Sequence, residues 1–434
     1  MKIVMFVHND MTMDVRVQRE ATSLAAAGHQ VTVMARPRDV RSQIGETDTH
    51  GAYAIVRVPM PGGWRRPWSV AQLPGRVINA VVCRLQGRQR TRSTGPRPID
   101  FMVKWRFAVL GWNARAAAAA PYADVYHGHD LSGLPAAVRA ADRNGGRVVY
   151  DSHEFFVESG NTALQPTWVR QRLANLERRL AGRSVALITV NETLSAILGE
   201  RLGVVRRVVV YNTPASLEVP AGDPTSARAN SPLRAALGGG DGPIALYHGG
   251  FMANRGLLTL VQAFRAPVVD GVHLAFLGAG PLAGELRRLA ADPAFGGRVH
   301  VFDAVPPSEL LAWVAGADVE CMVNAPASEN ERLSTPNKLF ESLAAGVPVV
   351  SSDFPERRRI VMDGATGPLG AVCDPADPAA VAAAIAALVN APAAERNALR
   401  ARCAEAARTS WNWEHEGAKL VALYADLAAE GAAR

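Results

Sequence analysis

The chain has 434 residues, of which 48% are hydrophobic and 20% are charged, and it carries a formal net charge of +7 at pH 7. That length exceeds what one hydrophobic core usually organises, so we expect two domains. The composition is typical of a soluble globular protein.

The spacing of the cysteines and the length of the apolar runs indicate the cellular compartment. The four cysteines are scattered without any C-x-x-C pair, which argues against a disulfide framework or a zinc site and fits a reducing cytoplasm. The apolar run at residues 1–7 is too short for a signal peptide, and no run approaches the length of a membrane span. We therefore expect a cytoplasmic protein.

The first half of the chain alternates predicted strands and helices. Strands are predicted at 2–7, 30–34, 124–126, 147–150, 185–190 and 207–211, and helices at 15–27, 136–141, 168–180 and 192–201. Alternation of this kind is typical of a parallel sheet with helical crossovers. Residues 1–214 are therefore predicted to form a Rossmann-like domain.

A change in composition separates this domain from a second one. Residues 215–243 are rich in Pro, Gly, Ala, Ser and Asp and are predicted to be a linker. Alternation restarts over residues 244–410, and a last helix within 411–434 is expected to pack back on the N-terminal domain. The predicted fold is α/β, with two doubly wound Rossmann-like domains facing across a cleft. Ligands of such sheets bind beyond the carboxyl ends of the strands.

The stretch from Leu333 to Val350 carries the sharpest local signal. Thr335 is a typical N-cap residue, Pro336 suits the first helical position, and Gly346 ends the predicted helix. A helix that starts after a strand presents free N–H groups to a phosphate. Glu341 lies further along among apolar residues and needs a polar partner, such as a ribose hydroxyl pair. The alternative is an ordinary capped helix with Glu341 on its wet edge.

Two polar clusters follow strands of the first domain. They are His127-Gly128-His129-Asp130 and Asp151-Ser152-His153-Glu154. A histidine at the carboxyl end of a strand can contact a sugar or a reacting hydroxyl, although it can equally cap the next helix. The spacing matches no zinc set, and no Asp-x-Asp is present to hold a nucleotide-bound cation, so we expect no essential metal.

Glycines and cations mark the second domain. Gly249 and Gly250 follow one predicted strand, and Gly278 and Gly280 follow the next. Small residues let a ligand approach the backbone, and Arg255 and Lys338 can neutralise a diphosphate, although Lys338 can equally be a solvated surface residue. The sequence lacks both the G-x-G-x-x-G fingerprint after the first strand and a Walker motif, which disfavours nicotinamide binding and ATP hydrolysis.

Positive charge is concentrated in residues 57–115. This segment has twelve Lys or Arg residues against one acid, and so carries +11 and leaves −4 for the rest of the chain. Its tryptophans are Trp64, Trp68, Trp105 and Trp112. Arginine and tryptophan with apolar spacers suit an anionic membrane surface or a lipid phosphate. A solvated insert is the alternative, and nucleic acid is disfavoured because no recognised module accompanies the segment.

Taken in order, several motifs resemble those of the family-4 glycosyltransferases, which have the two-domain GT-B fold. The similar stretches are Asp14-x-Arg16-Val17, Glu20-Ala21, Gly28-His29, His127-x-His129-Asp130, residues 150–154, 211–214 and 247–250, Arg255-Gly256, residues 278–281 and residues 334–341. The last is the most specific, and residues 57–115 lie largely outside the resemblance.

The resemblance implies a retaining hexosyltransferase that uses a nucleotide diphosphate sugar and no cofactor. Glu341 would hold the ribose, Arg255 and Lys338 the diphosphate, and His129 the donor sugar; we take His129, Glu341 and Arg255 as the catalytic set. Donor-site candidates are Gly249, Gly250, Arg255, Gly278, Gly280, Glu331, Ser334, Thr335, Asn337, Lys338 and Glu341. Acceptor-side candidates are Asp14, Arg16, His129, Asp130, Asp151, His153 and Glu154. Retention without an evident nucleophile would suggest front-face attack assisted by the leaving phosphate.

Two positions depart from the family pattern. The first of two glutamates eight positions apart falls on Leu333, so Glu331 or Glu329 is the candidate substitute. An arginine common in the family is replaced by Gly250, which leaves Arg255 as the matched cation.

These observations favour a cytoplasmic, metal-independent glycosyltransferase at the inner face of a membrane, acting on a lipid-linked or cell-surface polysaccharide acceptor. One alternative is the same enzyme with a soluble small-molecule acceptor. The other is a non-catalytic scaffold of the GT-B fold that binds a nucleotide sugar.

Overall fold

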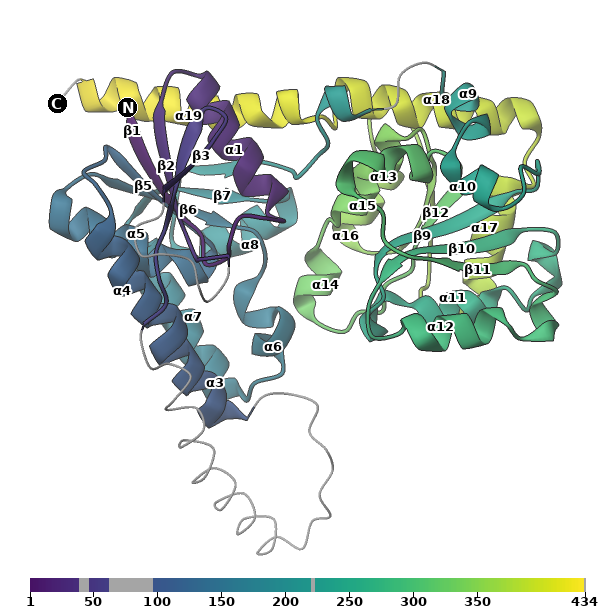
Figure 1. Ribbon diagram of the computed structural model, residues 1–434, viewed down its shortest axis with the longest axis horizontal. Coiled ribbons are helices and arrows are strands. Elements are labelled where there is room, and N and C mark those ends of the chain that lie inside the picture. The colour runs from purple at the N-terminus through teal and green to yellow at the C-terminus, as the bar shows by residue number, and fades with distance from the viewer. Residues whose placement is uncertain (39–46, 62–96, 220–222, 433–434) are drawn as a thin grey trace, which may run out of the picture. The chain divides into compact units, whose positions relative to one another are not determined.

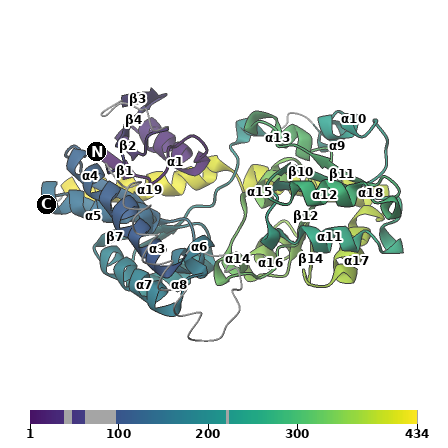
Figure 2. The same ribbon diagram turned by 60° about the horizontal axis from the view of Figure 1, so that its bottom comes forward.

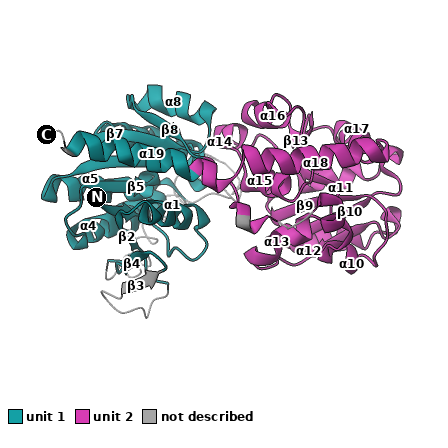
Figure 3. Ribbon diagram, turned by 90° about the horizontal axis from the view of Figure 1, so that it is seen from above, with its two compact units in different colours: residues 1–210, 417–434 teal, residues 211–416 magenta. Residues whose placement is uncertain are grey.

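The computed structural model describes residues 1–38, 47–61, 97–219 and 223–432. It divides into two compact units (Figure 3): unit 1 is Met1–Val210 with Gly417–Arg434, and unit 2 is Tyr211–Glu416. The boundary between Val210 and Tyr211 lies close to the domain boundary predicted at residue 214.

Unit 1 is built on a sheet with the strand order β3-β4-β2-β1-β5-β6-β7-β8. All its pairings are parallel except that of β3 with β4, at the edge visible in Figure 2. The central strands are almost wholly buried because helices cover both faces of a parallel sheet. The strands are β1 (Lys2–Phe6), β2 (Gln30–Ala35), β3 (Thr47–His50), β4 (Tyr53–Arg57), β5 (Val125–His129), β6 (Arg147–Ser152), β7 (Ser184–Thr189) and β8 (Arg207–Val209).

The helices of unit 1 cross over between these strands (Figure 1). They are α1 (Val15–Ala26), α3 (Pro98–Lys104), the π-helical turn η1 (Trp105–Val109), α4 (Leu110–Ala119), α5 (Asp130–Asn144), η2 (Phe156–Glu158), α6 (Gly160–Ala163), α7 (Thr167–Ala181) and α8 (Glu192–Leu202). Helix α19 (Trp413–Ala432) ends in this unit. There the Tyr424 hydroxyl lies 2.9 Å from His127 Nδ1.

Unit 2 is built on an all-parallel sheet with the order β11-β10-β9-β12-β13-β14. Its strands are β9 (Ile244–Gly250), β10 (His273–Ala279), β11 (Val299–Phe302), β12 (Val319–Met322), β13 (Val349–Ser352) and β14 (Gly370–Cys373). The order reverses between β9 and β12, whose carboxyl ends are therefore the expected place for a ligand. Both sheets confirm the predicted α/β fold class.

Helices pack on both faces of this second sheet (Figure 1). Apolar residues of α11, α12 and α17 pack on one face, and those of α10 and α13 on the other. The helical elements are η3 (Ser216–Glu218), α9 (Pro224–Ala229), α10 (Pro232–Ala236), η4 (Ala253–Arg255), α11 (Leu257–Ala263), η5 (Pro267–Val269), α12 (Ala283–Ala290), η6 (Pro293–Phe295), α13 (Pro307–Val314), α14 (Glu329–Leu333), α15 (Asn337–Ala344), α16 (Pro355–Val361), α17 (Pro378–Val389) and α18 (Ala393–Thr409).

The predicted linker at 215–243 is wrong for much of its length. Helices α9 and α10 lie within it, and Leu233 of α10 is fully buried. Arg234 pairs with Asp318 at 2.6 Å, and Arg228 also pairs with Asp318, at 2.7 Å. Because composition alone reports neither buried ion pairs nor a packed leucine, this segment looked like a linker although it belongs to unit 2.

The predicted membrane-facing tryptophans need a correction as well. Trp105 and Trp112 are buried, and Trp112 donates a hydrogen bond to the Val58 carbonyl oxygen at 3.0 Å. Arg57 is buried too, at 2% exposure. Trp64 and Trp68, with most of the predicted arginines, lie outside the described residues.

Across the described residues, no single helix has the length and apolar composition needed to cross a membrane, while one bent pair, Pro378–Val389 with Ala393–Gly431, meets that test by length and composition alone.

Candidate active site

Helix α15 begins one residue later than the sequence predicts. Pro336, rather than Thr335, is its N-cap residue, and it contributes no side-chain hydrogen bond. The first helical residue, Asn337, is exposed. A helix start of this kind offers backbone N–H groups to an anion.

Lys338 places a buried cation at this helix start. Its ammonium nitrogen is buried and has no hydrogen-bond partner within the described ranges. It lies 3.4 Å from the centre of the Tyr247 ring. Burial lowers the pKa of Lys338 to about 8 because the charged form loses its water. The surface role considered for Lys338 is therefore wrong, and an anionic ligand would supply the missing partner.

Glu341 has a partner inside the protein. Its Oε2 lies 3.0 Å from Nε2 of His248, and Nδ1 of His248 lies 3.0 Å from Oε2 of Glu320. Burial by itself would lower the pKa of His248, but Glu320 and Glu341 raise it to about 9. The polar partner expected for Glu341 is thus a histidine, and the Glu341 side chain keeps 26% exposure.

Glu331 and Arg255 form an ion pair. Arg255 Nη1 donates to Glu331 Oε1 at 2.9 Å. Asn254 and Asn324 donate to the same carboxylate at 2.9 and 3.2 Å. Leu333, at the position where the family often has a glutamate, is packed at 3% exposure. Glu331 therefore anchors the predicted diphosphate cation, while Glu329 is an exposed partner of Arg332.

Arg357 of α16 was not predicted from the sequence. Its guanidinium donates to the carbonyl oxygens of Ser334 and Met322, at 3.4 and 3.3 Å, and thereby braces the loop before α15. Burial lowers its pKa to about 10. Three consecutive arginines at 357–359 look like solvated charges in a sequence, so no local signal could have identified the buried one.

The structural reason for a glycine differs among the predicted glycine positions. Gly249 has φ +115°, and a Cβ there would stand 3.4 Å from the Lys338 ammonium. At Gly278 a Cβ would stand 2.0 Å from the Gly249 carbonyl oxygen, and at Gly280 it would clash with Phe251. Close packing of the chain therefore accounts for Gly278 and Gly280 without any ligand. Gly250 is exposed, and a Cβ there would make an ordinary contact with Met252 Cγ at 3.7 Å.

In unit 1 the predicted acceptor-side residues meet around Asp151. Arg16 donates to both Asp151 carboxylate oxygens, at 3.0 and 3.2 Å, and to the Val210 carbonyl oxygen at 2.6 Å. Burial would raise the pKa of Asp151, but Arg16 holds it well below its usual range. His153 contacts the same carboxylate at 3.0 Å.

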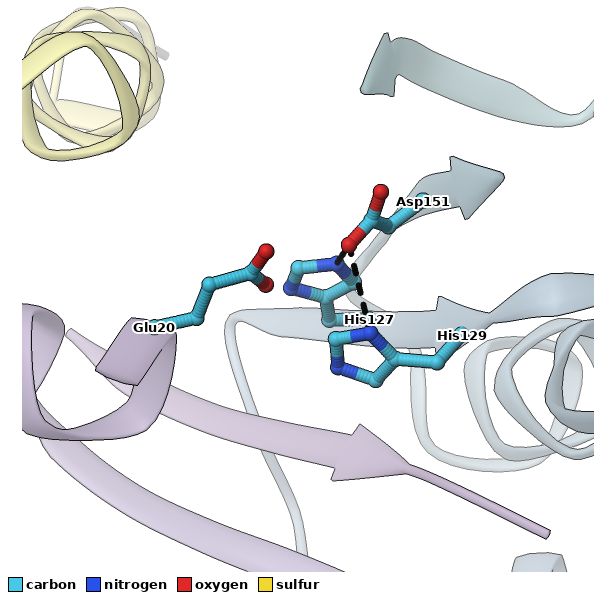
Figure 4. Close-up of side chains that lie close together, drawn as sticks. All are labelled: Glu20, His127, His129 and Asp151. Atoms are coloured by element: carbon cyan, nitrogen blue, oxygen red, sulfur yellow. Dashed lines mark ion pairs between the residues drawn. The ribbon is translucent and has the colours of Figure 1, made fainter. Parts of the chain in front are cut away.

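His127, His129, Asp151 and Glu20 face one another in a buried cluster (Figure 4). Their potential ligand atoms lie within 4.8 Å of one another. Glu20 and His127 belong to the motifs that resemble the family, but neither was assigned a role in the site. The Arg16 guanidinium is 2.9 Å from Glu20 and pairs with Asp151, so a positive charge already stands beside the oxygens that a metal would need. We therefore interpret the cluster as an ion-pair network.

Two histidine nitrogens of this cluster make no hydrogen bond to the described residues, although His127 Nε2 lies 3.9 Å from Asp151 Oδ2. Nε2 of His129 and Nε2 of His127 are buried and lack hydrogen-bond partners in the described part of the chain. Burial lowers the pKa of both histidines, so each is neutral at pH 7. His129 Nδ1 lies 3.3 Å from Asp151 and 3.2 Å from His153.

The remaining acceptor-side residues have structural partners. Asp14 caps α1 by accepting from the Val17 N–H at 3.2 Å. Asp130, with the positive φ of 52°, accepts from the His153 N–H at 2.9 Å. Burial lowers the pKa of His153, but Asp130 and Asp151 outweigh it and raise the value to about 10. Glu154 accepts from the Ser159 hydroxyl at 2.6 Å.

An apolar groove with a basic rim lies between α3, η1 and α7 of unit 1. Two adjoining hollows of about 460 and 340 Å³ share Met102, Arg106 and Arg172 in their linings. Ile99, Phe107 and Trp168 are 52–56% exposed there. The linings contain no Asp or Glu. The π-helical turn η1 forms part of the wall, and such turns are frequent at functional sites.

Two family profiles match the chain. The profile described as "Glycosyl transferase 4-like domain" matches residues 12–213, and the one described as "Glycosyl transferases group 1" matches residues 242–391. Together they span both units.

One curated relative matches along nearly the whole chain. It is the GDP-mannose-dependent alpha-(1-6)-phosphatidylinositol monomannoside mannosyltransferase of Mycolicibacterium smegmatis, 27% identical over 405 residues, which are 91% of this chain and 90% of that protein.

Solved structures share the fold at low identity. Sucrose-phosphate synthase from Thermosynechococcus elongatus superposes with a TM-score of 0.69 at 18% identity and covers 99% of both chains. Anabaena HepE in complex with UDP and glucose gives a TM-score of 0.66 at 14% identity, over 98% of this chain and 100% of that one.

Proposed function

We propose, from the premise that this chain belongs to the family-4 glycosyltransferases of the GT-B fold, that it moves a sugar from a nucleotide diphosphate sugar, with retention, to a lipid-linked or cell-surface polysaccharide acceptor. The reaction would run at the cytoplasmic face of a membrane.

The donor assignment rests on the buried ammonium of Lys338. A buried cation without a hydrogen-bond partner in the described residues is costly unless an anion binds it. It stands at the N-terminus of α15, where helix dipole and backbone N–H groups also favour negative charge. A diphosphate supplies that charge, and Glu341 on the same helix is the candidate for the ribose hydroxyls.

The same groups would favour the transition state over the ground state. As the bond between the sugar C1 and the diphosphate oxygen breaks, negative charge grows on the leaving phosphate near Lys338 and Arg255. In front-face attack, the acceptor hydroxyl oxygen bonds to C1 on the face the phosphate leaves, and its proton passes to that phosphate. The configuration at C1 is then retained. We assign His129 to a contact with the donor sugar.

The groove supports an amphiphilic acceptor. Exposed Ile99, Phe107 and Trp168 suit acyl chains, and Arg106 and Arg172 suit phosphates. The relative from M. smegmatis is named for a phosphatidylinositol mannoside acceptor. We therefore propose that α3, η1 and α7 make the lipid contact, with the exposed Trp168 among the contacting residues.

The identity of the donor is tested with a panel of nucleoside diphosphates. The protein is melted with GDP, UDP, ADP and dTDP, because a ligand of the native state raises the melting temperature by mass action. Turnover of the matching nucleotide sugars, with GDP-mannose among them, is then measured with and without a chelator. We expect one nucleotide to stabilise the protein and turnover to resist the chelator. Glu341→Ala should bind that nucleotide more weakly, with a smaller rise in melting temperature, and should turn over more slowly. Binding without turnover would favour a scaffold, and absence of binding by every nucleotide would refute the proposal.

The acceptor is tested with vesicles. Phe107→Glu and Trp168→Glu should weaken sedimentation with phosphatidylglycerol-containing vesicles and slow transfer to lipid acceptors. Val205→Glu, which alters a residue of unit 1 that is 93% exposed outside the groove lining, is the matched control. Equal partitioning of all four proteins would favour a soluble small-molecule acceptor instead.

A further inference from the structure

We infer that His248 and Glu320 are positioning residues, which set the Glu341 carboxylate for the ribose of the donor nucleotide. This inference rests on the proposed function, because it takes the ribose contact of Glu341 as given.

The three side chains form a chain of hydrogen bonds across three elements. His248 lies on β9 and Glu320 on the neighbouring parallel strand β12. Glu320 Oε2 is 3.0 Å from His248 Nδ1, and Glu320 Oε1 accepts from the His248 backbone N–H at 3.3 Å. On the other side, His248 Nε2 is 3.0 Å from Glu341 Oε2 on α15.

The exposed fraction of the side chains rises along this series of hydrogen bonds, from Glu320 through His248 to Glu341. The side chains of Glu320, His248 and Glu341 are 0%, 3% and 26% exposed. The two inner residues therefore do not reach solvent, while Glu341 does. Both Glu320 oxygens bond to His248, so this buried carboxylate acts on the histidine. Through His248 it acts on Glu341, whose side chain is partly exposed.

The bridge needs a charged imidazole. A neutral imidazole has one N–H, so it cannot donate to two carboxylates at once. The charged groups facing His248 are Glu320 on β12 and Glu341 with the nearby Lys338 on α15. On β10, the register partner is the apolar Leu277. The pKa of His248, raised to about 9, agrees with an imidazolium at neutral pH.

A fixed carboxylate binds a ribose better than a mobile one. The imidazolium holds one oxygen of Glu341 and so selects one rotamer before the ligand arrives. Loss of the hydrogen bond from His248 to Glu341 should weaken the ribose contact specifically. The diphosphate contact of Lys338 should stay intact.

The test measures a ratio of two dissociation constants. The nucleoside diphosphate found to bind in the panel is compared with its 2′,3′-dideoxy form by calorimetry, and the contribution of Lys338 cancels in that ratio. Wild type should prefer the ribose form by roughly tenfold to a hundredfold, as expected for a hydrogen bond to a charged group. In Glu341→Ala, which lacks the carboxylate, the ratio should be near one, and this value is the lower limit for the other variants.

We expect His248→Leu to lower the ratio towards that limit with the dideoxy affinity unchanged. His248→Gln should restore part of it, because its amide can still donate to Glu341. In wild type the ratio should fall as pH rises through about 9, where His248 loses its second N–H; in His248→Gln it should stay flat.

Four outcomes decide between these possibilities. A wild-type ratio near one, or an unchanged ratio in folded His248→Leu, would overturn the inference while nucleotide binding still stands. If His248→Leu does not fold, Glu320→Gln replaces it and should move the pH at which the ratio falls to a lower value; an unmoved midpoint would overturn the inference. Failure of wild type to bind any nucleotide refutes the proposed function instead.

Discussion

The ammonium nitrogen of Lys338 lies 3.4 Å from the centre of the Tyr247 ring, and the Tyr247 hydroxyl donates to the Gly250 carbonyl oxygen at 2.8 Å. The ring thus provides a cation–π contact to a buried cation and is itself held in place. This arrangement keeps a charge ready for an anion at some expense of stability in the unliganded protein.

Lys338→Met should therefore separate stability from binding. We expect nucleoside diphosphate affinity to fall about tenfold to a hundredfold, because a charge-assisted hydrogen bond is lost. The unliganded variant should melt at the same temperature as wild type or higher, since a buried unpaired charge is removed. Calorimetry and thermal melts measure the two quantities; a large loss of stability would contradict this account.

The difference in unfolding free energy between wild type and Lys338→Met should depend on pH, and the sign of this dependence follows from the pKa of Lys338. The folded pKa of Lys338, about 8, is below the ordinary lysine value, so the unfolded state binds more protons between about pH 8 and pH 10.4. Wild-type stability relative to Lys338→Met should therefore rise with pH in this window. The titration of His248 occurs in both proteins and cancels.

Glu331 and Glu329 form a matched pair for mutation. Glu331 accepts from Arg255, Asn254 and Asn324 and is mostly buried, so Glu331→Ala should cost about 1–3 kcal/mol of unfolding free energy. Glu329→Ala removes an exposed ion pair and should change stability by about 0.5 kcal/mol or less. Denaturant unfolding compares them, and equal effects would mean that the Glu331 network is dispensable.

The Arg16–Asp151 pair should show strong coupling. Both side chains are nearly inaccessible, so Arg16→Met leaves a buried carboxylate without its main cation and should cost about 3–5 kcal/mol. Adding Asp151→Asn should recover part of that loss, because the unpaired charge disappears. A double mutant cycle measures the coupling; purely additive losses would show that the two residues stabilise unit 1 independently.

Glu177 should make stability fall as pH rises. Its carboxyl group is buried and accepts from the Tyr150 hydroxyl at 2.7 Å, and burial raises its pKa to about 7. The folded state therefore binds more protons than the unfolded state between about pH 4.3 and 7, and stability is lost across that window. Glu177→Gln stays neutral and should be more stable than wild type at pH 8, by at most about 4 kcal/mol. At pH 4 the two should unfold at equal denaturant concentration; a difference independent of pH would contradict the assignment.

Local pattern was sufficient for most strands and for many of the helices. Apolar runs and helical spacing predict the central strands of the two sheets, because those strands are buried on both faces. Several elements escaped prediction, among them β3 and β4 at one edge of the first sheet and β14 at one edge of the second. The helices α3, α4, α9 and α10 were also missed, as was α16, whose arginines look solvent-exposed. Helix α15 and Glu341 were placed to within one residue, since caps and glycines act locally.

The pairings that shape the candidate site depended on the tertiary structure. Arg16 meets Asp151 from 135 positions away, and His248 meets Glu341 from 93. Residue spacing carries information only over a few turns, whereas strand order brings β9 beside β12 and β5 beside β6. The sequence therefore identified the family and most candidate residues. Only folding revealed that Trp105 and Trp112 are core residues, that Glu331 anchors Arg255, and that a buried histidine holds Glu341, because burial and charge pairing arise from contacts between distant segments.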